Sequence, residues 1–198
     1  MPDTVIRNAT IIDGTGAPRF VGDVSIEDGH IAEIGEISGS SADLEVDATD
    51  LVLAPGFVDV HTHDDGALVQ HPDMTFKVSQ GCTSVVVGNC GFSAIPAITG
   101  ENTLDLSGVE ASWSDLDGYR DAVEGSNPAV NAMMLVGHNT IRTLEMKGER
   151  GAPNDGQLLR MREHVELAMQ QGACGFSTGL IYRPGRWADT EEVLDLAK

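Results

Sequence analysis

The sequence has 198 residues and a formal net charge of −19, with 31 acidic side chains against 12 lysines and arginines. Such a surface repels nucleic-acid phosphates and anionic lipids, so neither nucleic acid nor a membrane is expected as a partner. Three widely spaced cysteines argue against a disulfide framework, and no signal peptide or membrane-spanning run is apparent. A soluble, cytoplasmic protein is expected.

The first fifty residues are predicted to form a small β domain. Short runs of β-branched and apolar residues alternate there with turn signals. We predict strands at residues 4–12, 24–26, 31–34 and 44–46. The second and third strands form a hairpin through the turn at Asp28-Gly29. A unit of about fifty residues buries too little surface to be stable alone.

The pattern changes at Leu51, where nearly continuous apolar runs begin. Such runs are typical of strands buried on both faces, as in a parallel sheet. These strands are predicted at residues 51–60, 83–87, 132–136 and 174–181. The sequence therefore predicts a second domain over residues 51–198.

Helical patterns separate the later strands. Ser114 is predicted to cap a helix over residues 115–124, and Asn154 or Asp155 a helix that runs to Gln171. The buried stripe of the second helix is predicted at Leu158, Met161, Val165 and Met169. A further helix begins after Thr190.

This alternation of strands and helices predicts an α/β fold with about four β/α units. A complete eight-stranded barrel needs about 250 residues, more than the second domain contains. The remaining alternatives are a small open sheet and an incomplete TIM-like barrel, truncated at its C-terminus. The last helix has no stop signal, which favours the truncated barrel.

The strongest chemical signal is the run over residues 55–63, PGFVDVHTH, in which a buried strand ends in His-x-His. Residues two apart on a strand project to the same side, so His61 and His63 can reach one metal ion together. The alternative is a pair of histidines with ordinary hydrogen bonds. Asp64 and Asp65 follow, either as acceptors that orient the two rings or as a solvated loop.

Cys90 follows the next predicted strand, in the run VVVGNCG, at the same end of the sheet as the histidine pair. A thiolate is a good zinc ligand, although a buried structural cysteine is the common alternative. Gly88 and Gly91 flank Cys90 and would let the backbone come close to a ligand. Beside the two histidines, Cys90 is predicted as the third metal ligand, with zinc as the metal.

Two further side chains follow the third and fourth strands. His138 could contact substrate or orient a ligand, and a hydrogen-bonded loop histidine is the alternative. Tyr182 could donate a hydrogen bond to a substrate carboxylate or carbonyl, and a packing role is the alternative. Both are retained as candidate substrate-binding residues. Cys82 and Cys174, at the starts of strands, are interpreted as core residues.

Together these segments resemble the N-acyl-D-amino-acid deacylases, or D-aminoacylases, of the amidohydrolase superfamily. The resemblance spans essentially the whole chain, and its motifs are specific in combination. It rests on the runs PGFVDVHTHDD, VVVGNCGFS, LVGHNTIR and GFSTGLIYRPGRWADTEEV, at residues 55–65, 85–93, 135–142 and 175–193.

The resemblance implies a distorted TIM barrel with a small β-sandwich domain, and hydrolysis of N-acyl-D-amino acids by a zinc-activated water. His61, His63 and Cys90 match the metal-binding positions. The cysteine replaces the carbamylated lysine of hydantoinases, and residues 172–182 contain no lysine, which disfavours a hydantoinase-like cyclic amidase. The further histidines and the general acid/base aspartate of the family are expected beyond Lys198. The isolated chain is therefore expected to be inactive, and a non-catalytic metal-binding fragment is the remaining alternative.

Overall fold

The computed structural model describes residues 2–39, 42–97 and 111–198. The chain divides into two compact units, Met1–Gly56 and Phe57–Lys198. The division therefore lies six residues later than the boundary expected from the sequence. No helix in the described residues is long and apolar enough to cross a membrane.

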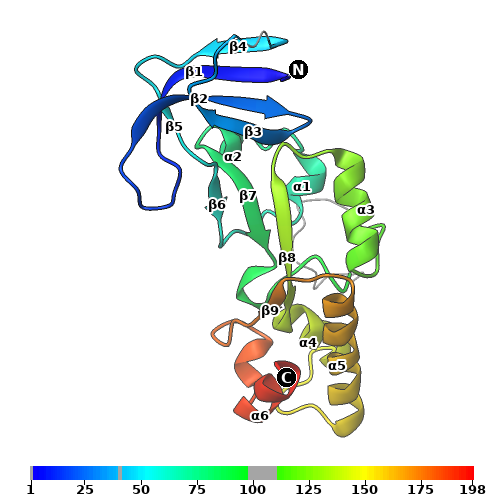
Figure 1. Ribbon diagram of the computed structural model, residues 1–198. Coiled ribbons are helices and arrows are strands. Elements are labelled where there is room, and N and C mark those ends of the chain that lie inside the picture. Colours follow the sequence, from blue (N-terminus) through cyan, green and yellow to red (C-terminus); the bar gives the residue numbers. More distant parts are fainter. Residues whose placement is uncertain (1, 40–41, 98–110) are drawn as a thin grey trace. The chain divides into compact units, whose positions relative to one another are not determined.

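The first unit is a five-stranded mixed sheet, in the order β3-β2-β1-β4, with β5 also paired to β1 (Figure 1). Its strands are β1 (Thr4–Ile11), β2 (Phe20–Glu27), β3 (His30–Gly35), β4 (Leu44–Asp47) and β5 (Val52–Leu53). The predicted hairpin is confirmed, because β2 and β3 pair antiparallel. Asp28 and Gly29 between them have positive φ angles of 51° and 73°, as a tight hairpin turn requires.

The apolar run over residues 51–60 was predicted as one strand, and this prediction is wrong. Val52–Leu53 pairs in parallel with β1 and belongs to the first unit. Only Phe57–Asp59, which is β6, joins the sheet of the second unit. Pro55 and Gly56 separate the two strands because proline has no N–H to donate to a sheet and glycine weakens a strand.

The second unit contains a parallel sheet in the order β6-β7-β8-β9 (Figure 1). Its other strands are β7 (Cys82–Val87), β8 (Asn131–Gly137) and β9 (Gly175–Ser177). Four parallel strands with helices between them confirm the predicted α/β fold. All four strands run the same way, so their carboxyl ends lie at one edge of the sheet, where side chains from successive strands can meet.

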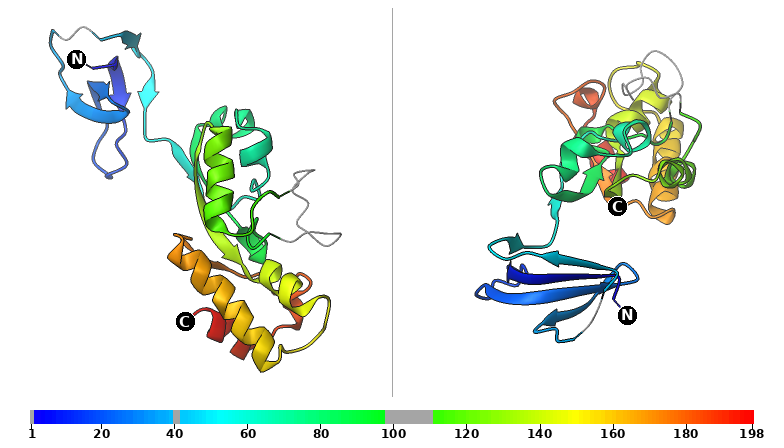
Figure 2. Two further views of the ribbon diagram at one scale, coloured as in Figure 1. Left: turned by 90° about the vertical axis from the view of Figure 1, so that its right-hand side faces the viewer. Right: turned by 90° about the horizontal axis from the view of Figure 1, so that it is seen from above.

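Helices connect these strands and complete the core. They are α1 (Ala67–Gln70), α2 (Thr75–Val78), α3 (Leu116–Ser126), α4 (His138–Met146), α5 (Asp155–Gln170) and α6 (Thr190–Leu196). Figure 2 shows α3 and α5 as the two long helices of this unit. Leu116 and Tyr119 of α3 and Met161 of α5 are buried with Val85 and Val136 of the sheet.

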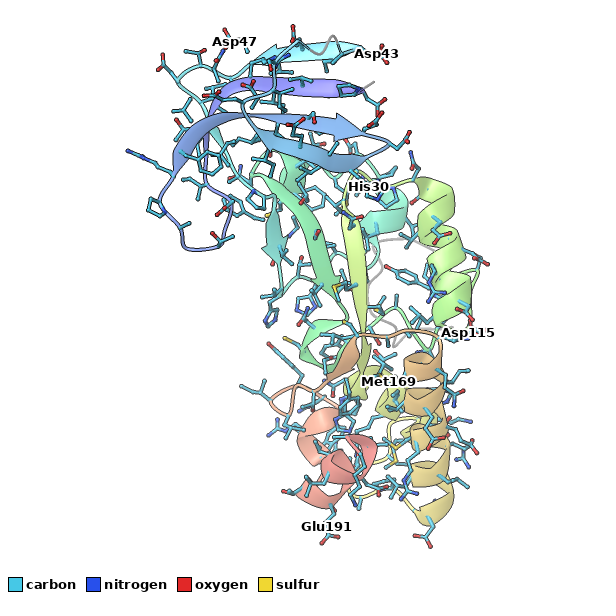
Figure 3. The ribbon with its side chains drawn as sticks, in the orientation of Figure 1. His30, Asp43, Asp47, Asp115, Met169 and Glu191 are labelled. Atoms are coloured by element: carbon cyan, nitrogen blue, oxygen red, sulfur yellow. The ribbon has the colours of Figure 1, made fainter. Side chains whose placement is uncertain are left out.

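Two details of the helices differ from the sequence prediction. The N-cap of α3 is Asp115, whose side chain accepts a hydrogen bond from the Gly118 N–H, rather than Ser114 (Figure 3). Helix α4 was not predicted: His138, for which a loop position was one of two alternatives, begins this helix directly after β8. The predicted cap of α5 is confirmed, because Asn154 forms a complete capping box with Gln157.

Candidate metal centre

His61, His63 and Cys90 converge at the carboxyl ends of β6 and β7. Each offers one ligand atom, and the three atoms lie within 4.8 Å of one another. The Nε2 atom of His61 lies 3.2 Å from the Sγ atom of Cys90. The two histidine rings are exposed and the cysteine is half-buried, so solvent can reach the cluster.

The chemistry of this donor set fits zinc. Two imidazoles and one thiolate are ligands that Zn²⁺ binds tetrahedrally, whereas Ca²⁺ and Mg²⁺ require several oxygen ligands. Two of the donors follow β6 in one short segment and the third lies in the turn after β7, so the pairing of these two strands brings them together.

Cys90 lies in a tight turn directly after β7. The turn is a short 3-10 segment, Asn89–Gly91, in which Cys90 has φ 57° and ψ 22°. This left-handed conformation is uncommon for a residue with a side chain. Gly88, two residues before Cys90, has a φ angle of +81°. A Cβ at Gly88 would lie 2.1 Å from the Leu135 carbonyl oxygen. The space at Gly88 is therefore taken by β8, not by an approaching ligand as the sequence suggested.

Asp65 connects the two segments that carry the ligands. Its carboxylate has no solvent exposure and accepts hydrogen bonds from the N–H groups of Gly88, at 3.3 Å, and Ala94, at 3.1 Å. Burial raises the pKa of Asp65 to about 6, and these N–H groups oppose the rise. The expected alternative of a solvated loop is wrong for this residue. Asp65 instead holds the chain on both sides of Cys90 against the segment of the histidine pair.

Lys77 of α2 stabilises the segment that carries the histidines. Its ammonium lies 2.6 Å from Asp59 and 2.9 Å from Asp64, and it donates to the hydroxyl of Thr62 at 3.1 Å. The hydrogen bond from Lys77 lowers the pKa of Asp59, and the same carboxylate accepts from the His61 N–H at 3.2 Å. Asp64 is thus an ion-pair partner of Lys77.

The two candidate substrate-binding residues have different surroundings. The His138 ring is fully buried, with Nε2 2.7 Å from Glu192 and Nδ1 3.1 Å from the Thr178 hydroxyl. Both ring nitrogens are engaged within the chain, which favours a structural histidine over a substrate contact. Tyr182 is 48% exposed, and its ring lies 5.8 Å from that of Phe92.

The other two cysteines do not join the cluster. Cys174 is exposed and Cys82 is half-buried, so the prediction that both are core residues is wrong for Cys174. Cys174 lies at the amino end of β9, and its thiol donates to the Met134 carbonyl at 3.2 Å. A strand start is the opposite edge of a parallel sheet from the metal centre, which explains why Cys90 alone reaches it.

Sequence reasoning missed three residues that hold the site: Lys77, Asn139 and Ser177. Ser177 accepts from the Gly91 N–H at 3.0 Å and donates to the Gly88 carbonyl, on either side of Cys90. Asn139 donates to the carbonyl of Cys90 itself. A usable signal existed for Asn139 and Ser177, since Ser177 is the last residue of β9 and Asn139 follows the end of β8 by two positions. Lys77 lies on a short helix that carried no signal.

Comparisons with known proteins find a matching family and similar chains. A model of the amidohydrolase family matches residues 44–196. Over 99% of its length the chain is 42% identical to an N-acyl-D-glutamate deacylase and 40% identical to a D-aminoacylase, both from Alcaligenes xylosoxydans. The chain spans 41% of the length of these two relatives.

A solved structure shows the same fold. It is the crystal structure of N-acyl-D-glutamate deacylase from Bordetella bronchiseptica, complexed with zinc and a phosphonate inhibitor that mimics the tetrahedral intermediate of the reaction. The TM-score is 0.93 at 43% identity, over 99% of this chain and 42% of the crystallised one.

Proposed function

Because this chain belongs to the amidohydrolase family, we propose that it supplies three metal ligands to a zinc-dependent hydrolase that cleaves the amide bond of N-acyl-D-amino acids. The observation that carries the proposal is the convergence of His61, His63 and Cys90 within 4.8 Å. The relatives named for the deacylation of N-acyl-D-amino acids support the substrate class. The zinc in the Bordetella bronchiseptica structure supports the metal.

In such an enzyme, zinc lowers the pKa of a water molecule to about 7 and polarises the carbonyl of the amide. The residues of this chain hold the site in shape and keep it open. Exposed rings at His61 and His63 leave one side accessible to a substrate. Lys77 and Asp65 hold the two ligand-bearing segments in place through buried or half-buried contacts. Such support keeps donor atoms within the narrow geometry that a metal requires.

Proton transfer needs a further group. Asp65 is unsuited to it, because its side chain has no exposed surface and accepts from two backbone N–H groups. We propose Tyr182, exposed beside Phe92, as a substrate contact that donates a hydrogen bond to a carboxylate or carbonyl. We propose that the general acid/base is an aspartate that is not among the residues of this chain.

The zinc site is tested by metal content. After removal of metal with a chelator and reloading with zinc, the wild-type chain should retain zinc through dialysis, measured by atomic emission. His61→Ala and Cys90→Ala should bind zinc at least tenfold more weakly, because each removes one donor. His71→Ala and Cys174→Ala are matched controls, since both side chains are exposed and lie outside the cluster. Full zinc retention by Cys90→Ala would remove the cysteine from the site.

The activity is tested on the full-length protein. We expect zinc-dependent release of the free amino acid from N-acetyl-D-glutamate or N-acetyl-D-methionine, and none from the L enantiomers. Chelation should abolish the activity, and added zinc should restore it. Ring opening of a hydantoin without cleavage of the linear amides would support a cyclic amidase instead. Absence of turnover with every one of these compounds would refute a hydrolytic role.

A further inference from the structure

The side chain of Asn139, the second residue of α4, makes three hydrogen bonds around the metal centre. Its Nδ2 donates to the carbonyl oxygen of Cys90 at 3.0 Å and to that of Gly179 at 3.3 Å. Its Oδ1 accepts from the Gly185 N–H at 2.6 Å. The side chain is fully buried, so no water competes for these groups. Both ends of the amide are therefore used, and the plane of the amide is defined.

Cys90 needs such support because its backbone is in the left-handed region, at φ 57°. A residue with a Cβ is strained there and stays only when its surroundings hold it. The direction of the Cα–Cβ bond, and hence the set of positions that Sγ can reach by rotation about that bond, follows from this backbone conformation. A relaxed Cys90 would point its thiol elsewhere and lose the 3.2 Å approach to His61 Nε2.

The chain packs closely around the Asn139 amide. A Cβ at Gly179 would lie 2.2 Å from the Cys90 carbonyl oxygen, and a Cβ at Gly185 would lie 2.3 Å from Asn139 Oδ1. Only glycine permits this approach at either position. The loop after β9 thus packs against both the amide and the carbonyl that it holds.

We propose that Asn139 is a positioning residue for the metal centre, which holds the Cys90 carbonyl so that the thiolate points at the ion. This inference rests on the proposed zinc site. Asn139 itself does not touch the ion. Its contribution is to the arrangement of a ligand, so its loss should weaken the sulfur–metal bond while leaving both imidazole donors in place.

The test replaces Asn139 by aspartate in the 198-residue chain. Asn139→Asp keeps the size and the acceptor for the Gly185 N–H but loses both donors. The control is Thr140→Val on the same helix, which removes hydrogen bonds to Ser93 at a buried position without touching Cys90. Cobalt is the probe, because the absorption of a thiolate-to-cobalt charge-transfer band reports the sulfur ligand directly.

We expect Asn139→Asp to bind cobalt and zinc 10- to 100-fold more weakly, the usual cost of losing support behind a ligand. At saturating cobalt, its charge-transfer band should be weaker per bound ion than in the wild type. Thr140→Val should keep the full band and an affinity close to that of the wild type. If Asn139→Asp does not fold by circular dichroism, Asn139→Ser, whose side chain is too short for the same contacts, is measured in its place.

Two outcomes would overturn the inference. One is wild-type affinity and a full charge-transfer band in the Asn139 variant. The other is an equal loss in Thr140→Val, which would show that any defect in α4 disturbs the site. A wild-type chain that binds neither cobalt nor zinc would instead refute the proposed zinc site, and the positioning role with it. The wild-type titration therefore separates the two failures.

Discussion

Glu192 is a carboxylate with almost no exposure to solvent, and it lies between two basic side chains. One oxygen is 2.7 Å from His138 Nε2, and the other accepts from a guanidinium N–H of Arg142. Arg142 is itself fully buried and also donates to the Gly151 carbonyl at 2.8 Å. A buried charge is tolerable only when it is paired, so each member depends on the others.

Glu192→Ala should therefore lower the free energy of unfolding by about 3–5 kcal/mol, because it leaves the buried guanidinium without its counter-charge. The measurement is urea denaturation followed by circular dichroism. Glu191→Ala, at the neighbouring exposed position of α6, should change the stability by less than about 0.5 kcal/mol. Equal stabilities for the two variants would show that the Arg142–Glu192 pair contributes nothing to the fold.

Helix α5 shows how a stripe predicted from periodicity can shift in the folded protein. Four residues were predicted to be buried, and Met161 and Val165 are, at 0% and 8% exposure. Met169, which is labelled in Figure 3, is 45% exposed. Ala168, one position earlier, is buried. Ala168 and Met169 are neighbours on the helix, and the smaller side chain faces the core at this end.

The two methionines of α5 form a matched pair for a test. Met161→Ala removes a fully buried side chain and should cost about 2–5 kcal/mol of stability. Met169→Ala removes an exposed side chain of the same type from the same helix and should cost less than about 0.5 kcal/mol. Thermal or urea unfolding of both variants measures the difference. A larger loss of stability in Met169→Ala than in Met161→Ala would support the buried stripe that was predicted from the sequence.

At the scale of the whole molecule, the excess of acidic side chains should make stability depend on salt. A net charge of −19 means that repulsion opposes the compact state. Raising the ionic strength from about 0.01 M to about 1 M shortens the Debye length from about 30 Å to about 3 Å. The urea concentration at the midpoint of unfolding should therefore rise as potassium chloride is added. Sodium chloride should act alike, because screening does not distinguish the two cations. A midpoint that falls with salt would contradict this explanation.

Most of the architecture followed from local patterns. The β-branched and apolar run of β1, the turn at Asp28-Gly29 and the capping box at Asn154 each depend on residues within a few positions of one another. The prediction failed where local signals competed. The run over residues 51–60 is apolar throughout, and only the pairing of its two halves with different sheets divides it.

The sequence by itself determined the donor set of the candidate site, because a His-x-His pair at a strand end and a cysteine after the next strand are local features. The tertiary structure decided what surrounds these donors. Asn139 is 49 positions from Cys90, and Ser177 is 86 positions from Gly91. Such contacts arise from the order of the strands in the sheet, which no short-range pattern encodes. The same long-range packing buries the His138 ring and places its Nε2 2.7 Å from Glu192, a partner 54 positions away.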